Sequence, residues 1–194
     1  MNMEAVNLAN NSTTSKRREL DFYPTPPEVT HALMMFMQTE GLLEDVNTVW
    51  EPACGDGAMS KVIEQYVTEV ISTDLRETGY GTGGRDYLLH SVPADAIITN
   101  PPFNQSAEFI TKATGEARIV AMVLKSQYWH ASKRTALFQQ FPPAYVLPMN
   151  WRPDFKAAEN EANGKKGAPT MEVLWTLWIQ GQQDARYRIL SKPQ

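Results

Sequence analysis

The chain has 194 residues and a mass of 21.8 kDa, enough for one domain with a hydrophobic core and too short for two full ones. Hydrophobic residues make up 42% and charged residues 21%, which excludes a disordered acidic chain and a low-complexity repeat. One Cys and three scattered His exclude a disulfide framework and give no metal-ligand spacing, so we expect no metal. We find no signal-peptide core and no apolar run of the roughly 18 residues that cross a bilayer, and therefore expect a cytoplasmic protein without a membrane partner.

The charge is unevenly distributed along the chain, whose formal net charge is −4. Residues 1–100 hold 6 Lys and Arg against 15 Asp and Glu, whereas residues 101–194 hold 12 against 7. The basic excess in the second half favours contact with a polyanion, although a solvated charged surface is the more common cause of such an excess.

Residues 1–20 are polar, so we expect a flexible N-terminal arm followed by a single domain over residues 21–194. The domain opens with DFYPTPPEVTHALMMFM, in which Thr25 and Glu28 have the spacing of a capping box and Pro26 occupies the favoured first helical position. We therefore expect a helix to begin there. Apolar residues at helical spacing give it one buried face: Val29, Leu33, Phe36 and Met37.

From residue 47 onward, short apolar runs alternate with segments of helical pattern. The runs are NTVWE, TEVIST, DAIIT, RIVAMVL and AYVLPM, and the helical segments are AMSKVIEQY, NQSAEFITKAT and SKRTALFQQ. This alternation predicts an α/β fold with a doubly wound, mostly parallel sheet. The last run, MEVLWTLWIQ, follows a polar loop without a helical crossover, so we expect an antiparallel last strand. We expect one further strand to end just before Asp86, which gives seven strands in all.

A glycine-rich turn joins the first strand of the predicted sheet to a helix, and reads Glu51-Pro52-Ala53-Cys54-Gly55-Asp56-Gly57. Ligands of open α/β sheets bind at such turns, where glycines let the backbone approach them. Ser60 replaces the third glycine of the dinucleotide fingerprint, and no basic residue flanks the turn, so a pyrophosphate fits poorly. An ordinary turn is the alternative, and we interpret Cys54 as a packing residue.

Three acids follow successive predicted strands at one edge of the sheet. They are Glu51, Asp74 and Asp86, and Asp74 stands where an acid commonly accepts hydrogen bonds from ribose hydroxyls. Each alone is more often a solvated loop acid. Together they suit a ligand with an adenosyl group and a cationic amino-acid tail.

The most specific motif is Asn100-Pro101-Pro102-Phe103, directly after the run AIIT. Two prolines hold the backbone extended and remove two donors, so the Asn100 side-chain oxygen and the Pro101 carbonyl can act as paired acceptors. Such a pair suits a planar amine with two N–H donors, and Phe103 offers a face for stacking. For a bare motif, the alternative is a proline-stiffened turn with a packed Phe.

In chain order, EPACGDG, the acid of STDL, RDYLL and NPPF resemble the motifs of class I S-adenosylmethionine-dependent methyltransferases. NPPF resembles the branch that methylates planar exocyclic or amide nitrogens. DFYPTPPEV resembles the N-terminal cofactor motif of bacterial and phage DNA adenine-N6 methyltransferases of the Dam-like type. The resemblance covers roughly residues 21–130, with the motifs in order, and extends weakly to the WRPDF and MEVLWTLW segments. The first motif begins with Glu51 where Asp is commoner.

The resemblance implies a Rossmann-like methyltransferase fold with S-adenosylmethionine as cofactor. Its methionine end would lie near Tyr23 and Thr25, over Gly55 and Gly57, with its amino group near Glu51. Its ribose would lie at Asp74 and its adenine between Asp86 and Tyr87. The implied catalytic residues are Asn100, Pro101, Pro102 and Phe103: an adenine rotated out of DNA would stack on the ring and donate both N6 hydrogens to the paired acceptors, with no general base.

DNA contacts are expected at the same sheet edge. The candidates are Lys125 directly after the run RIVAMVL and, in a loop over residues 150–170 that we expect to be mobile without DNA, Arg152, Lys165 and Lys166. With no segment left for a recognition domain, we expect short or relaxed sequence specificity. Two alternatives stay open: a methyltransferase for another planar nitrogen (protein glutamine or RNA guanine N2), and a non-catalytic nucleic-acid-binding protein on the same fold.

Overall fold

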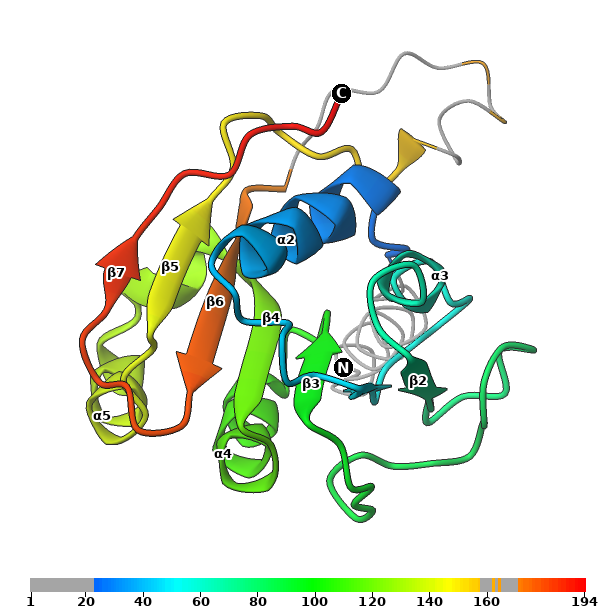
Figure 1. Ribbon diagram of the computed structural model, residues 1–194, viewed down its shortest axis with the longest axis horizontal. Coiled ribbons are helices and arrows are strands. Elements are labelled where there is room, and N and C mark those ends of the chain that lie inside the picture. The colour runs from blue at the N-terminus through cyan, green and yellow to red at the C-terminus, as the bar shows by residue number, and fades with distance from the viewer. Residues whose placement is uncertain (1–22, 158–161, 163, 165–170) are drawn as a thin grey trace, which may run out of the picture.

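The computed structural model describes residues 23–157, 162, 164 and 171–194, which contain a seven-stranded sheet with helices on both faces (Figure 1). The strand order is β2-β1-β3-β4-β6-β5-β7. The pairs β2·β1, β1·β3 and β3·β4 are parallel, whereas β6 is antiparallel to both β4 and β5. The strands are β1 (Thr48–Glu51), β2 (Glu69–Ser72), β3 (Ala96–Thr99), β4 (Ile119–Lys125), β5 (Tyr145–Pro148), β6 (Val173–Ile179) and β7 (Arg186–Tyr187).

The predicted fold class is confirmed, including the antiparallel strand formed by the run MEVLWTLWIQ, which is β6. The position of one strand was wrong. In the described chain the segment before Asp86 forms only an isolated bridge, between Thr73 and Thr82. Gly79, Gly81 and Gly84 there have φ of 82°, 64° and 66°, which an extended strand does not accommodate. The seventh strand is instead β7, two exposed residues that pair in parallel with β5 at the opposite edge.

Helices cover both faces because successive strand residues point to opposite sides of the sheet. One face buries Val49, Ile98 and Ala121 together with Leu33 of α2 and Ile63 of α3. The other face buries Trp50, Ile97 and Val120 against α4, and α5 packs at its margin. The helices are α2 (Pro27–Thr39), α3 (Ser60–Ile63), α4 (Ser106–Glu116) and α5 (Thr135–Gln140), with 3-10 turns η1 (Ser126–His130) and η2 (Ser132–Arg134) after β4.

The apolar face predicted for the first helix is confirmed, but its predicted capping box is wrong. Val29, Leu33 and Met37 are buried in α2, with Phe36 packed at their margin. The helix begins at Pro27 with Pro26 as its N-cap residue, and no side chain caps it. The Thr25 hydroxyl instead accepts a hydrogen bond from the Asn100 side chain.

Part of the loop predicted to be mobile is packed against the core. Phe155 is buried in the cluster beneath α2, and Trp151 packs against the same cluster. Lys165 and Lys166 lie outside the described residues, as does the predicted arm over 1–20. No helix in the described part of the chain is both long and apolar enough to cross a membrane.

Candidate active site

A cavity of about 480 Å³ lies at the carboxyl ends of β1, β2 and β3. Because β1 is flanked by β2 on one side and β3 on the other, this is the point where the winding of the sheet reverses, the usual ligand crevice of open α/β folds. The walls come from the turn after β1, the segment after β2, the motif after β3 and the residues before α2. Ten of the twelve predicted catalytic and cofactor residues line it; the two that do not are Gly55 and Gly57.

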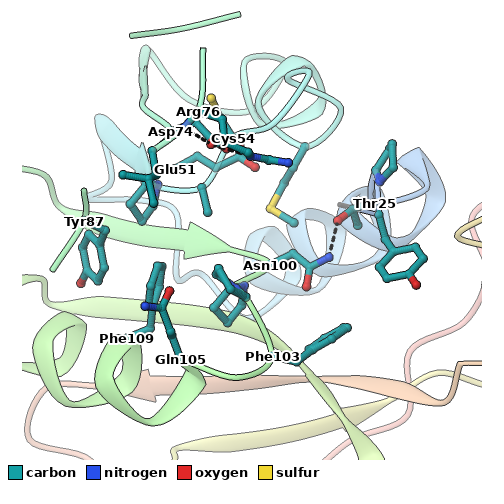
Figure 2. A pocket seen from close by; sticks show the side chains of 18 of the residues that line it. Thr25, Glu51, Cys54, Asp74, Arg76, Tyr87, Asn100, Phe103, Gln105 and Phe109 are labelled. Atoms are coloured by element: carbon teal, nitrogen blue, oxygen red, sulfur yellow. Dashed lines mark hydrogen bonds and ion pairs between the residues drawn. The ribbon is translucent and has the colours of Figure 1, made fainter. Parts of the chain in front are cut away.

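Asn100 lies half-buried in the cavity wall directly after β3. Its Nδ2 donates a hydrogen bond of 3.1 Å to Thr25 Oγ1. Its Oδ1 is buried and finds no hydrogen-bond partner among the residues that the structure describes. Figure 2 shows the amide nitrogen joined to Thr25, with the oxygen turned toward the side where Phe103 lies. A buried acceptor without a donor is costly, so this oxygen is suited to a ligand that brings an N–H group.

The rest of the motif forms the wall beside Asn100. Pro101 is buried and Pro102 half-buried, and the Pro102 carbonyl accepts the Gln105 N–H at 2.9 Å in the turn that leads into α4. Phe103 is half-buried and lines the cavity, so an aromatic ring is available for stacking next to the free amide oxygen.

Glu51 is 2% exposed at the end of β1 and lines the cavity. Its carboxylate accepts a short hydrogen bond from Ser60 Oγ, which also lies 2.6 Å from Ser72 Oγ. Burial raises the pKa of Glu51 to about 8, against the opposing effect of the Ser60 hydrogen bond. In the free protein this carboxyl is therefore largely protonated at neutral pH, and a cationic group placed beside it would favour its ionised form.

Asp74 is buried two residues after the end of β2, and its carboxylate organises the neighbouring turn. Oδ2 accepts the Gly55 N–H at 2.8 Å, and Oδ1 accepts the Arg76 backbone N–H at 2.8 Å. The Arg76 guanidinium also pairs with Asp74, at 3.1 Å. Arg76 Nη2 donates to Oδ2 as well, at 3.2 Å, so each carboxylate oxygen accepts two N–H groups. Asp74 thus links the loops after β1 and β2, and a further donor would take the place of the Arg76 guanidinium.

An aromatic wall closes the side of the cavity opposite Thr25 (Figure 2). The Tyr87 ring lies 4.5 Å from that of Phe109 and 5.1 Å from that of Trp50, centroid to centroid. Burial raises the pKa of the Tyr87 hydroxyl, which donates to Glu116 at 3.3 Å. Asp86 is half-buried beside it, and its Oδ1 accepts the Leu88 N–H.

The turn after β1 depends on left-handed glycines. Gly55 and Gly57 have φ of 55° and 79°, and a Cβ on Gly57 would lie 2.5 Å from the Tyr80 ring. Close packing against Tyr80 thus accounts for the glycine at 57. Cys54 is buried, and burial raises its pKa to about 12, which supports its interpretation as a packing residue and not a nucleophile.

Sequence reasoning missed several residues of the cavity wall. Arg76 stands two residues after Asp74, a spacing that would have suggested an ion pair, whereas Gln105 and Phe109 reach the cavity only through the packing of α4. In the described chain no group of three or more His, Cys, Asp or Glu lies close enough together to hold a metal ion.

Two lysines lie over aromatic rings of the cavity wall. The Lys125 ammonium is 3.9 Å from the centroid of Phe103, and that of Lys156 is 5.9 Å from the centroid of Tyr23. Arg152, another predicted DNA contact, forms an exposed ion pair of 2.9 Å with Glu172.

No protein-family model and no curated protein matches the chain, but solved structures do. The methyltransferase subunit of a type I restriction-modification system from Streptococcus thermophilus matches with a TM-score of 0.66 and 12% identity, over 87% of this chain and 47% of its own. A candidate class I S-adenosylmethionine-dependent methyltransferase from Listeria monocytogenes matches with a TM-score of 0.58 and 11% identity, over 89% of this chain and 66% of its own. The magnesium protoporphyrin IX methyltransferase from Synechocystis, solved with bound SAM, matches with a TM-score of 0.52 and 14% identity, over 80% of this chain and 79% of its own.

The chain has the methyltransferase fold. It spans less than two thirds of the length of the first two of these structures. At identities of 11–14% these structures resemble the chain in fold alone. Because one fold can serve many substrates, the function depends on the residues of the cavity.

Proposed function

We propose that the chain transfers a methyl group from S-adenosylmethionine to the N6 amine of adenine in DNA. The observation that carries this proposal is the buried Oδ1 of Asn100, which has no partner among the described residues and stands between the acid-lined part of the cavity and the Phe103 ring. An exocyclic amine stacked on that ring would supply the missing N–H donor.

The cavity fits the proposed cofactor. Its volume of about 480 Å³ lies within the range of small-molecule sites. Glu51 is placed for an ammonium group, Asp74 for ribose hydroxyls, and the Tyr87 and Phe109 rings for a flat base. When bound there, S-adenosylmethionine supplies an electrophilic methyl group on a sulfonium sulfur.

The residues of the motif after β3 would act on the amine. Asn100 Oδ1 and the Pro101 carbonyl accept one N6 hydrogen each, which draws the nitrogen toward tetrahedral geometry and leaves its lone pair free for the methyl carbon. These hydrogen bonds strengthen as positive charge develops on N6, so they stabilise the transition state more than the ground state. Phe103 holds the ring plane by stacking. After transfer the cationic N6 releases one of its two hydrogens as a proton to solvent water, so no separate base is required.

Two observations favour adenine of DNA over other substrates with a planar amine. The segment that resembles the cofactor motif of DNA adenine methyltransferases contributes Tyr23 and Thr25 to the cavity wall. Lys125 and Lys156 lie over rings of that wall, where they would meet phosphates that flank an extruded base. The same acceptors also fit a protein glutamine or guanine N2 of RNA, and a non-catalytic nucleic-acid-binding role is the remaining alternative.

One assay separates these functions. The protein is incubated with S-adenosylmethionine labelled in its methyl group and, in separate reactions, adenine-rich DNA, RNA and bulk protein; the labelled polymer is then digested to its monomers. We expect label in N6-methyldeoxyadenosine. Label in methylated guanosine or methylglutamine would replace the proposed substrate, and no label in any polymer would favour the non-catalytic alternative.

A further inference from the structure

The hydrogen bond from Asn100 Nδ2 to Thr25 Oγ1 joins two segments 75 positions apart in the chain. Thr25 is only 4% exposed and lies between Pro24 and Pro26, just before α2. The proline at 26 restricts its backbone, and the Pro26 carbonyl accepts the Val29 N–H as the helix begins. The hydroxyl is therefore presented by a rigid segment anchored in the core.

The chemistry of a carboxamide makes this contact important. The two ends of the Asn100 group are nearly equal in size, yet one only accepts and the other only donates. If the amide turned by 180°, its NH₂ would face the N–H groups of an incoming amine, and the acceptor that the reaction needs would be lost. Something must therefore fix its orientation before the substrate arrives.

We propose that Thr25 is a positioning residue that anchors the Asn100 amide with Nδ2 on its hydroxyl, so that Oδ1 faces the substrate. In the structure the hydroxyl accepts from Nδ2, and Oδ1 has no partner among the described residues. This inference deepens the proposed function and rests on it. It also gives Thr25 a role different from the cofactor contact that the sequence resemblance implies.

The test uses three variants of the full chain. Thr25→Val keeps the side-chain shape and removes the hydroxyl, Thr25→Ser keeps the hydroxyl, and Thr30→Val makes the same change at another buried threonine, one outside the cavity wall. Thermal melting monitored by circular dichroism verifies that each variant folds. For each, we measure kcat and KM for methyl transfer to DNA and the Kd of S-adenosylmethionine.

We expect Thr25→Val to lower kcat about fivefold or more, the effect of losing one hydrogen bond, with the cofactor Kd changed less than about twofold. Thr25→Ser should restore most of kcat, and Thr30→Val should match the wild type. A kcat for Thr25→Val within about threefold of wild type overturns the proposal. So does a loss of cofactor affinity that matches the loss of rate, because Thr25 would then be a cofactor contact.

A second measurement does not depend on the substrate. In the free protein, nuclear magnetic resonance of the Asn100 side-chain NH₂ should show slow hydrogen exchange in the wild type and Thr25→Ser, and faster exchange in Thr25→Val. Equal exchange in all three overturns the positioning role even if DNA is not the substrate. Absence of DNA methylation by the wild type, with the exchange difference present, would instead contradict the proposed function alone.

Discussion

The Lys125 ammonium lies 3.9 Å from the centroid of the Phe103 ring. Phe103 lines the cavity, whereas Lys125 is not among the residues that line it. Because the ammonium lies over one face of the ring, only the other face is left for a base. A positive charge at the carboxyl end of β4 thus stands next to the ring on which we propose that the base stacks.

Lys125→Gln should weaken DNA binding and reduce the dependence of log affinity on log salt concentration by about one unit, because one phosphate contact is lost. The matched control is Arg118→Gln, since Arg118 is an exposed cation at the other end of the same strand, where it donates to the Asp45 carbonyl. Fluorescence anisotropy of labelled DNA over a salt series measures the affinity and its salt dependence for each variant. Parallel salt slopes for the wild type and Lys125→Gln would remove Lys125 from the DNA interface.

Asn100→Ala should abolish methylation while cofactor affinity stays nearly intact, because the change removes the free acceptor and no contact with the acids that we assign to the cofactor. The matched control is Asn150→Ala, which removes an exposed amide hydrogen-bonded to Ser191, outside the cavity wall. A variant that kept more than about a tenth of the wild-type rate, an effect below roughly 1.4 kcal/mol, would contradict the catalytic assignment.

Asp74→Ala should weaken cofactor binding by about 1.5 to 3 kcal/mol, the effect of losing hydrogen bonds to a charged acceptor. Asp95→Ala is a suitable control, because Asp95 also accepts two backbone N–H groups, from Asn47 and Thr48, but outside the cavity wall. Both variants should lose stability, and only Asp74→Ala should lose cofactor affinity. Titration calorimetry with S-adenosylmethionine that gave the same Kd for both would move the ribose site elsewhere.

Glu51 should make the free protein less stable as the pH rises from 4.5, the ordinary pKa of the group, to about 8. In that window the unfolded chain ionises Glu51 while the folded chain keeps it protonated, so the folded state binds more protons and the free energy of unfolding falls with pH. Glu51→Gln should flatten this part of the pH dependence. Urea unfolding of both proteins across the window measures the slopes, and identical slopes would show that Glu51 is ionised in the folded protein.

Gly57→Ala and Gly79→Ala form a matched pair. Both glycines have positive φ, 79° and 82°, so both substitutions incur backbone strain of about 1–2 kcal/mol. Only a Cβ at 57 would meet another group, the Tyr80 ring, whereas nothing lies within 4 Å of one at 79. Gly57→Ala should therefore lower the free energy of unfolding by a further 1 to 3 kcal/mol, roughly the cost of overpacking. Equal losses in urea unfolding would mean that the ring moves aside freely.

The fold was predictable because alternating apolar runs and helical segments repeat along most of the chain, and burial of both sheet faces follows from the runs themselves. The strand expected before Asp86 failed for a local reason: glycines at 79, 81 and 84 adopt left-handed conformations that end any extended pairing. The two-residue strand β7 carries almost no pattern, since both of its residues are exposed.

The cavity was predictable where its residues follow strand ends, because parallel strands bring those ends to one edge. Partners were not. Thr25 and Glu28 have the spacing of a capping box, yet Asn100, 75 positions later, takes the Thr25 hydroxyl. Local spacing cannot distinguish a cap from such a distant partner, and the same holds for Phe109, which reaches Tyr87 only when α4 packs on the sheet.

The contact of Trp50 with Tyr87 has a spectroscopic consequence. The indole is 1% exposed, its Nε1 donates to Thr73 at 3.0 Å, and its ring lies 5.1 Å from that of Tyr87, centroid to centroid. That ring is part of the cavity wall, and a flat group placed against it alters the field and the packing that the indole senses. We therefore expect the intrinsic ultraviolet emission of the unlabelled chain to contain a component that changes when the cavity is occupied, and Trp50→Phe to delete that component.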